Sequence, residues 1–189
     1  LAQHVYERIR EMIADGALVP GERINRKELE EVLGVSQTPI NDALSRLAGE
    51  RFIEQESRRG YYVKRISAEE MIHLFEYRAA TEGMAARLCA ESAPQEEREK
   101  LREYFGEFKL PIHEDARQEY RRQDAAFHRT VLELSGNPML AEMNEAHGYM
   151  MKSYQKGLLR DPNETLHEHL DIVEAIVAGD PEKAQERMS

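Results

Sequence analysis

The 189-residue chain contains a single cysteine, Cys89, and it lacks long apolar runs and an excess of positive charge. One thiol cannot build an internal disulfide framework, and this suits a reducing compartment. We expect Cys89 to be a small buried residue on a helix. No apolar run approaches the roughly 18 residues that cross a bilayer, and no segment near the N-terminus has the features of a signal peptide. The sequence therefore predicts a cytoplasmic protein, and its ends at Leu1 and Ser189 suggest a piece trimmed from a longer chain.

An excess of positive charge is also missing, since 26 Lys/Arg stand against 36 Asp/Glu for a net charge of −10. The acidic excess is not spread evenly. Residues 1–66 hold eleven charges of each sign, so the whole excess lies in residues 67–189. The end of the first segment is locally basic, with five Lys/Arg between Arg51 and Arg65. Local charge, rather than the charge of the whole chain, attracts phosphate, so the acidity does not exclude DNA binding.

The first segment carries the pattern of a helix-turn-helix. Apolar residues recur at helical spacing over residues 5–13. A second, short helix is expected between Asn25 and Gly34, and Asn25 with Glu28 has the spacing of a capping box. Ser36 is the expected N-cap of a third helix. Two helices joined by a short turn that contains glycine are typical of a helix-turn-helix.

The pattern then changes from helical to extended. The β-prone runs 52–53 and 61–63 flank the turn-prone, basic segment 57–60. This predicts a two-stranded wing with a cationic tip. Residues 1–66 are therefore expected to form a winged helix-turn-helix domain.

The remainder of the chain is helical by pattern throughout. Ser67 resembles an N-cap, with Glu70 three residues later, and starts this part. Proline and glycine breaks divide it into expected helices near 68–92, 95–109, 114–134, 138–158, 163–178 and from 181 onward. The predicted fold class is mostly α, with an all-helical bundle over residues 67–189 behind the winged helix.

The first 65 residues resemble the GntR family of bacterial regulators. The residues that carry this resemblance, in the family's order and spacing, are Gly16, Pro20-Gly21-Glu22, Leu29, Leu33-Gly34-Val35-Ser36, Thr38-Pro39, Ala43-Leu44, Leu47 and Gly60. The rest resembles the FadR-type sensor of that family, the FCD domain, and six helices would place it in the VanR-like branch. Here the carrying residues are Arg78 with Glu82, the run Asp124 to His128, Gly136-Asn137-Pro138, Glu168-His169, Ile172, Glu174-Ala175-Ile176 and Gly179-Asp180.

The recognition helix departs from the family's usual Ser-Arg-Thr-Pro-Val-Arg-Glu-Ala-Leu. Gln37 and Asn41 replace both arginines, and Asp42 replaces the glutamate. Arginine is suited to guanine, whereas glutamine and asparagine are suited to adenine, so the family's usual operator is not expected here. A loss of DNA binding is the weaker alternative, because basic residues remain. The expected DNA-contacting residues are Lys27, Ser36, Gln37, Thr38, Asn41, Arg46, Arg58, Arg59 and Gly60.

Asp124 and His128 lie four residues apart on one expected helix, so they share a face and could chelate one divalent cation. Taken alone, such a pair is more often a salt bridge. The resemblance adds His169 as a third ligand and implies a fourth histidine just past Ser189. The imidazole ligands favour zinc or nickel. Three protein ligands would leave positions open for water or a carboxylate.

Two further residues are candidates for binding an effector. The resemblance places Arg78 at the inward-facing arginine of the first sensor helix, and a guanidinium suits a carboxylate. Its alternative role is an ordinary salt bridge to Glu82, four residues on. His147 is expected on the same face as Met151, either lining the pocket or hydrogen-bonded in the core.

The resemblance implies a ligand-responsive repressor or activator that binds a short palindromic DNA site as a homodimer and senses a small organic acid. An alternative is a helical metal-dependent hydrolase or lyase that uses Asp124, His128 and His169. The sequence has no evident general base or nucleophile motif for that role. A TetR-like regulator is a third hypothesis, and the predicted wing argues against it.

Overall fold

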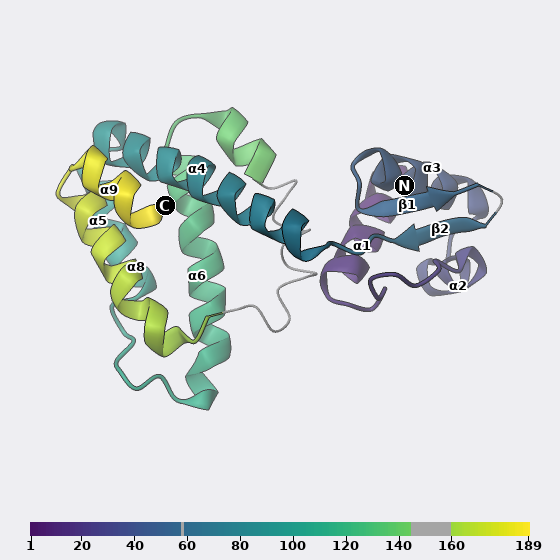
Figure 1. Cartoon of the computed structure of the whole chain (residues 1–189), viewed down its shortest axis with the longest axis horizontal. Helices are drawn as coiled ribbons and strands as arrows, with labels where there is room; N and C mark the ends of the chain where they lie inside the picture. Colours follow the sequence, from purple (N-terminus) through teal and green to yellow (C-terminus); the bar gives the residue numbers. More distant parts are fainter. Residues whose placement is uncertain (58, 145–159) are drawn as a thin grey trace. The chain divides into compact units, whose positions relative to one another are not determined.

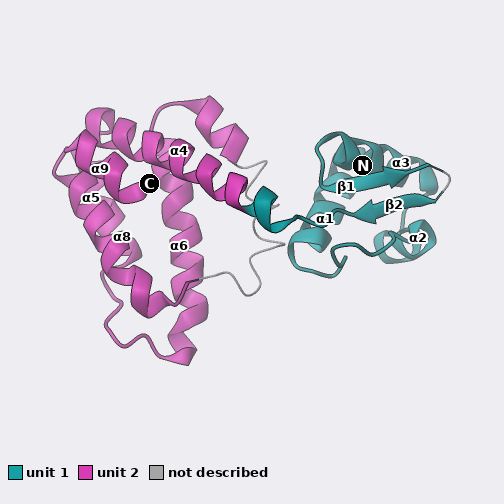
Figure 2. Ribbon diagram, viewed as in Figure 1, with its two compact units in different colours: residues 1–71, 146–158 teal, residues 72–145, 159–189 magenta. Residues whose placement is uncertain are grey.

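The computed structural model describes residues 1–57, 59–144 and 160–189. These residues divide into two compact units, Leu1–Met71 and the described residues from Ile72 onward (Figure 2). The sequence places the domain boundary a few residues earlier, between residues 66 and 67. Each unit has its own hydrophobic core and is described separately below.

The first unit is a winged helix-turn-helix, as predicted (Figure 1). The strands pair antiparallel, with Ile53 opposite Val63 and Glu56 opposite Gly60. Ile9, Ile40 and Leu44 are fully buried, so the three helices share one apolar core with the base of the wing. The elements are α1 (Ala2–Ala14), α2 (Arg26–Leu33), α3 (Gln37–Gly49), β1 (Ile53–Glu56) and β2 (Gly60–Val63).

Particular residues fix where α2 begins and ends and where α3 begins. Gly34 ends α2 in the left-handed region, at φ 63°, where a side chain would be strained. The Asn25 side chain accepts a hydrogen bond from the backbone N–H of Lys27 at 3.2 Å. Ser36 is the N-cap of α3, but its hydroxyl makes no cap hydrogen bond. Pro39, the third helical residue, has no N–H to offer, so the usual N-cap partner is missing.

Every regular element in the described part of the second unit is a helix, as predicted. The expected helix 138–158 is described only as far as residue 144, and residues 138–144 are helical. The helices with complete bounds are α4 (Ala68–Ser92), α5 (Gln95–Lys100), the 3-10 helix η1 (Leu101–Tyr104), α6 (Glu114–Leu134), α8 (Pro162–Val177) and α9 (Pro181–Met188).

The predicted helix 95–109 is wrong in its second half. Helix α5 ends at Lys100, η1 reaches Tyr104, and a turn follows. Phe105 is fully buried against Phe127, with ring centroids 5.2 Å apart, so the chain turns to place that ring in the core. A Cβ at Gly106 would lie 3.0 Å from the carbonyl oxygen of Arg102, so a larger residue would crowd the backbone of this turn.

Cys89 is fully buried within the core of the second unit, in agreement with the expectation from sequence. Burial raises the pKa of its thiol to about 11, so it is not a reactive thiolate at neutral pH. Within the described ranges, no helix combines the length and apolar character that a membrane span requires.

The start of α4 gives a first prediction about stability. Ser67 Oγ accepts from the Glu70 backbone N–H at 3.1 Å, and Glu70 accepts from the Ser67 backbone N–H at 3.0 Å. Ser67→Ala should lower the free energy of unfolding by about 0.5–2 kcal/mol, because a helix-terminal N–H loses its partner. Denaturant unfolding followed by circular dichroism measures this. Ser45→Ala, at an exposed position inside α3, is the control and should cost nothing; equal losses in both variants would remove the capping role.

Candidate metal centre and nucleic-acid interface

The three predicted metal ligands meet between two helices of the second unit. Asp124 and His128 lie one turn apart on α6, and His169 lies on α8 beside it (Figure 1). Nε2 of His169 is 2.8 Å from Asp124 Oδ1, and Nε2 of His128 is 3.6 Å from the same oxygen. One donor atom from each residue lies within 4.8 Å of the others. This set of one carboxylate and two imidazoles fits a divalent transition metal.

A second layer of side chains fixes the ring of His169. Tyr120 Oη lies 2.7 Å from His169 Nδ1 and 2.9 Å from Thr165 Oγ1. The Phe105 ring stacks on the imidazole, with centroids 4.7 Å apart and planes 13° apart. Because Nδ1 is engaged by the phenol, Nε2 is the atom left for a metal. Such outer partners orient metal-binding histidines and tune their basicity.

Glu82, on α4, belongs to the site although the sequence singled it out only as a partner of Arg78. Its side chain is 7% exposed, and Oε2 lies 2.8 Å from His128 Nδ1. Arg78 donates to both carboxylate oxygens, from Nε at 2.7 Å and from Nη2 at 3.0 Å. Asn144 Nδ2 donates to Oε1 at 3.3 Å. His128 thus lies between two carboxylates: its Nδ1 faces Glu82, and its Nε2 faces Asp124.

The charges in this cluster are strongly coupled. Burial opposes ionisation of Glu82 and Asp124, but the neighbouring cationic groups outweigh it and hold both pKa values well below the usual range. Burial also opposes a charged His128, but Glu82 and Asp124 outweigh it and raise the pKa of His128 to about 9. Without metal, His128 is therefore protonated at neutral pH. A divalent cation would replace that proton.

This protonation gives a second prediction. Metal must displace the proton of His128, so uptake at pH 7 should release about one proton from this residue, and affinity should rise about tenfold per pH unit up to pH 9. The sign follows from the raised pKa: acid favours the imidazolium and opposes the metal. Calorimetric zinc titrations in buffers of different ionisation enthalpy measure the proton count. An affinity independent of pH between 6 and 8 would show that the metal does not bind His128.

Arg78 lies beside this cluster, in agreement with its expected inward position. Its side chain is 24% exposed, and its fork is taken up by Glu82, as the salt-bridge alternative proposed. Burial opposes its charge, but Glu82 and then Asp124 outweigh it and raise the pKa of Arg78. The guanidinium is therefore within electrostatic reach of Asp124, one of the candidate metal ligands. His147 and Met151 lie outside the described residues.

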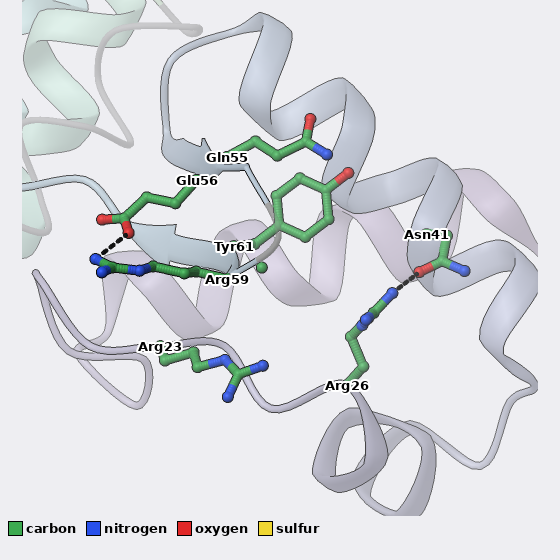
Figure 3. Close-up of a pocket in the computed structure, with 8 residues that line it drawn as sticks. Arg23, Arg26, Asn41, Gln55, Glu56, Arg59 and Tyr61 are labelled. Carbon is green, nitrogen blue, oxygen red and sulfur yellow. Dashed lines mark hydrogen bonds and ion pairs between the residues drawn. The ribbon is translucent and has the colours of Figure 1, made fainter.

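In the first unit, a surface cavity of about 350 Å³ lies between the wing, α2 and α3 and is open to solvent. A neighbouring hollow of about 380 Å³ shares Arg23 and Arg26 with it and adds the predicted contacts Lys27 and Gln37. The side chain of Arg59, also predicted, is 76% exposed at the wing (Figure 3). The residues that line the first cavity are Arg23, Arg26, Asn41, Gln55, Glu56, Arg59, Gly60 and Tyr61.

Arg23 and Arg26 are not among the interface residues predicted from the sequence. Arg23 precedes α2 and Arg26 begins it, so neither lies in the recognition helix that the sequence motif points to. The available signal was the concentration of three cations, Arg23, Arg26 and Lys27, within five residues at the start of the helix-turn-helix. Together with Arg59 they form a surface that is cationic and accessible, the property that attracts DNA phosphates.

The predicted contact Arg46 is placed differently from the others. Its guanidinium lies over the Tyr6 ring, 3.8 Å from the centroid, and donates to Glu50 at 2.9 Å and to Gln3 at 2.7 Å. These contacts tie α3 to α1. Arg58, the other predicted cation of the wing, lies outside the described residues.

A winged helix-turn-helix with a cationic face, followed by a helical domain with an Asp/His/His cluster, defines a class of two-part regulators. The family of bacterial regulatory proteins called gntR matches residues 1–63, and the FCD domain matches residues 73–189. The chain belongs to the GntR family of transcription regulators, in the group that carries an FCD domain.

Individual relatives agree with this assignment. The HTH-type transcriptional regulator YdhC of Bacillus subtilis is 28% identical over 141 residues, which are 74% of this chain and 63% of that protein. The "Probable D-xylose utilization operon transcriptional repressor" of Paenarthrobacter nicotinovorans is 28% identical over 191 residues, covering 100% of this chain and 84% of its own length. The structure of McbR from E. coli has the same fold, with a TM-score of 0.77 at 22% identity, over 98% of this chain and 90% of that one.

These comparisons decide between the functional classes. The matching families and relatives are transcription regulators, so the chain is a regulator and not a hydrolase or lyase. The match to YdhC spans less than two thirds of that protein, so what the whole protein binds is a matter for proposal.

Proposed function

We propose that this protein is a ligand-responsive repressor that binds a short palindromic DNA site as a homodimer. Its FCD domain holds a zinc or nickel ion on Asp124, His128 and His169 and senses a small carboxylate. Occupation of that domain shifts the relative orientation of the two DNA-binding domains and hence the affinity for DNA. Repression, rather than activation, is proposed by analogy with the Paenarthrobacter relative, which is named as a transcriptional repressor.

The observation that carries this proposal is the convergence of the three donor atoms next to Arg78. Three protein ligands leave coordination positions open, and a carboxylate is a suitable occupant. Arg78 uses two of its five N–H groups for Glu82, so three remain for a second carboxylate. An acid bound at one end to the metal and at the other to Arg78 would be oriented by both. Pockets of this kind use a few polar groups to select their ligand.

The DNA-binding half of the proposal rests on the exposed ends of α2 and α3. Gln37 and Thr38, in the first turn of α3, are exposed for contact with base edges. The Ser36 hydroxyl makes no cap hydrogen bond and is free to donate to a phosphate. Further contacts with DNA phosphates come from Lys27, Arg59 and the peptide N–H of Gly60.

One experiment tests the regulator as a whole. Selection from random duplexes should return a palindromic site for the purified protein. Addition of a panel of small mono- and dicarboxylic acids should then change the affinity of zinc-loaded protein for that site, while neutral analogues of the same size should not. Zinc-stripped protein should not respond to the acids. A response that is the same with and without metal would contradict the proposed sensor.

The electrostatic surface gives a third prediction. Arg59→Ala should weaken binding to all sequences and reduce the slope of log K against log salt by about one, because one phosphate contact no longer releases a counterion. Fluorescence anisotropy at several salt concentrations measures the slope. Arg122→Ala, a similarly exposed arginine on α6, removes the same charge from the second unit and is the control. An unchanged slope for Arg59→Ala would remove the wing from the DNA contact.

A further inference from the structure

Arg26 and Asn41 are joined across the helix-turn-helix by a side-chain hydrogen bond. Arg26 Nη1, at the start of α2, donates to Asn41 Oδ1 on the recognition helix at 3.2 Å. The residues are 15 apart in sequence, and both line the open cavity between α2, α3 and the wing (Figure 3). Arg26 is exposed and Asn41 is half-buried, so the pair lies at the surface with Asn41 as its fixed partner.

The chemistry of the pair settles which way the amide faces. A guanidinium has five donors and no acceptor, so only the oxygen of the Asn41 amide can face Arg26. The Nδ2 group, with its two N–H donors, therefore points away from Arg26. The hydrogen-bonding groups that the pair has left over are then N–H donors of both residues and one lone pair of Oδ1, which lies beside the positive charge of Arg26. Asparagine by itself presents one donor and one acceptor side by side.

This difference changes the base that fits. Adenine offers the N7 acceptor and the N6 donor in the major groove, so it matches a free asparagine amide. Guanine offers two acceptors, N7 and O6, and it matches an edge where N–H donors predominate and the remaining acceptor lies next to a positive charge. We infer that Arg26 and Asn41 act as one unit that recognises guanine, and that Arg26 is a specificity-determining residue outside the recognition helix. This inference rests on the proposed DNA binding through α3.

The surroundings keep Arg26 available for this role. Glu56 is the acidic residue among those that line the cavity, and it pairs with Arg59 at 3.4 Å. Arg23 shares the cavity but lies beside the wing, with Nε 3.4 Å from where a Cβ on Gly60 would be. Among the described cations that line this cavity, Arg26 is the one hydrogen-bonded to the recognition helix, and Arg23 is a matched control of the same charge.

The test is site selection from random duplexes, followed by affinity measurements on the four bases at each half-site position. Asn41→Ala locates the position, because its preference should flatten there. Wild type should prefer guanine over adenine at that position by about 5- to 150-fold, the range for one well-matched base contact. Arg26→Ala should reverse this preference toward adenine, Arg26→Lys should keep guanine because lysine also only donates, and Arg23→Ala should leave the preference unchanged.

The outcomes separate the inference from the function beneath it. Adenine preferred by wild type at the position that Asn41→Ala flattens would overturn the inference and leave DNA binding standing. So would an Arg26→Ala variant that selects the same half-site as wild type at every position; this readout holds even if Asn41→Ala no longer binds. If wild type enriches no sequence at all, the proposed DNA binding fails and the inference fails with it.

Discussion

His169→Ala should lower the affinity for zinc by more than about 100-fold at neutral pH. Even the removal of a side chain that only hydrogen-bonds to a metal ligand lowers metal affinity by about 10- to 100-fold. The variant removes one of three converging donors, Nε2, and leaves Asp124 and His128 on a single helix turn. Zinc titration by calorimetry gives the affinity, and elemental analysis after dialysis gives the metal retained. Circular dichroism confirms that the helices persist.

Two companion variants separate coordination from a general disturbance. His167→Ala, two residues earlier on α8 and exposed, should bind zinc as wild type does. Tyr120→Phe keeps the ring in the core but removes the hydroxyl that lies 2.7 Å from His169 Nδ1, and zinc affinity should fall by about 10- to 100-fold. Zinc binding by His169→Ala at wild-type affinity would show that the metal lies elsewhere or that the cluster is an ionic network.

Arg78→Ala should weaken binding of the best carboxylate effector by about 10- to 150-fold, the equivalent of 1.5–3 kcal/mol for a charged hydrogen bond. The variant removes the donors that remain after Arg78 pairs with Glu82. Arg78→Lys should recover part of the loss, because an ammonium keeps the charge but lacks the planar fork. Zinc content should remain nearly unchanged, because the pair of Glu82 with His128 persists.

Calorimetric titration of an acid panel into zinc-loaded wild type and both variants measures this effect. Arg87→Ala, elsewhere on α4, is the control: that arginine contacts Glu182 and Gln185, away from the cluster. Equal affinity of wild type and Arg78→Ala for the best acid would reduce Arg78 to a partner of Glu82. Binding of neutral ligands alone would have the same meaning.

The parts of this protein that follow from local pattern could be predicted from the sequence. The glycine at 34 and the cap at Asn25 set the helix-turn-helix, and both act on neighbours within a few residues. Asp124 and His128 share a face because they are four residues apart. His169 could be joined to them only through the family resemblance, since its place on α8 depends on how two helices pack.

The parts that depend on packing could not be predicted. Glu82 reaches the Asp/His/His cluster from α4, and no spacing links it to the ligands. Tyr120 lies four residues before Asp124 on α6, so its face could be predicted, but its contact with His169 on α8 could not. The contact of Arg26 with Asn41 spans 15 residues and two helices. The early end of the helix after Pro94 follows from the burial of Phe105, whose core partners are distant in sequence.

The most direct measurement of the central claim is anomalous X-ray scattering from crystals of zinc-loaded protein, collected at the zinc edge. We predict one strong peak per protomer, about 2.0–2.2 Å from Nε2 of His128, Nε2 of His169 and a carboxylate oxygen of Asp124. A zinc-loaded crystal with its peak away from these three residues, or with none between them, would contradict the account.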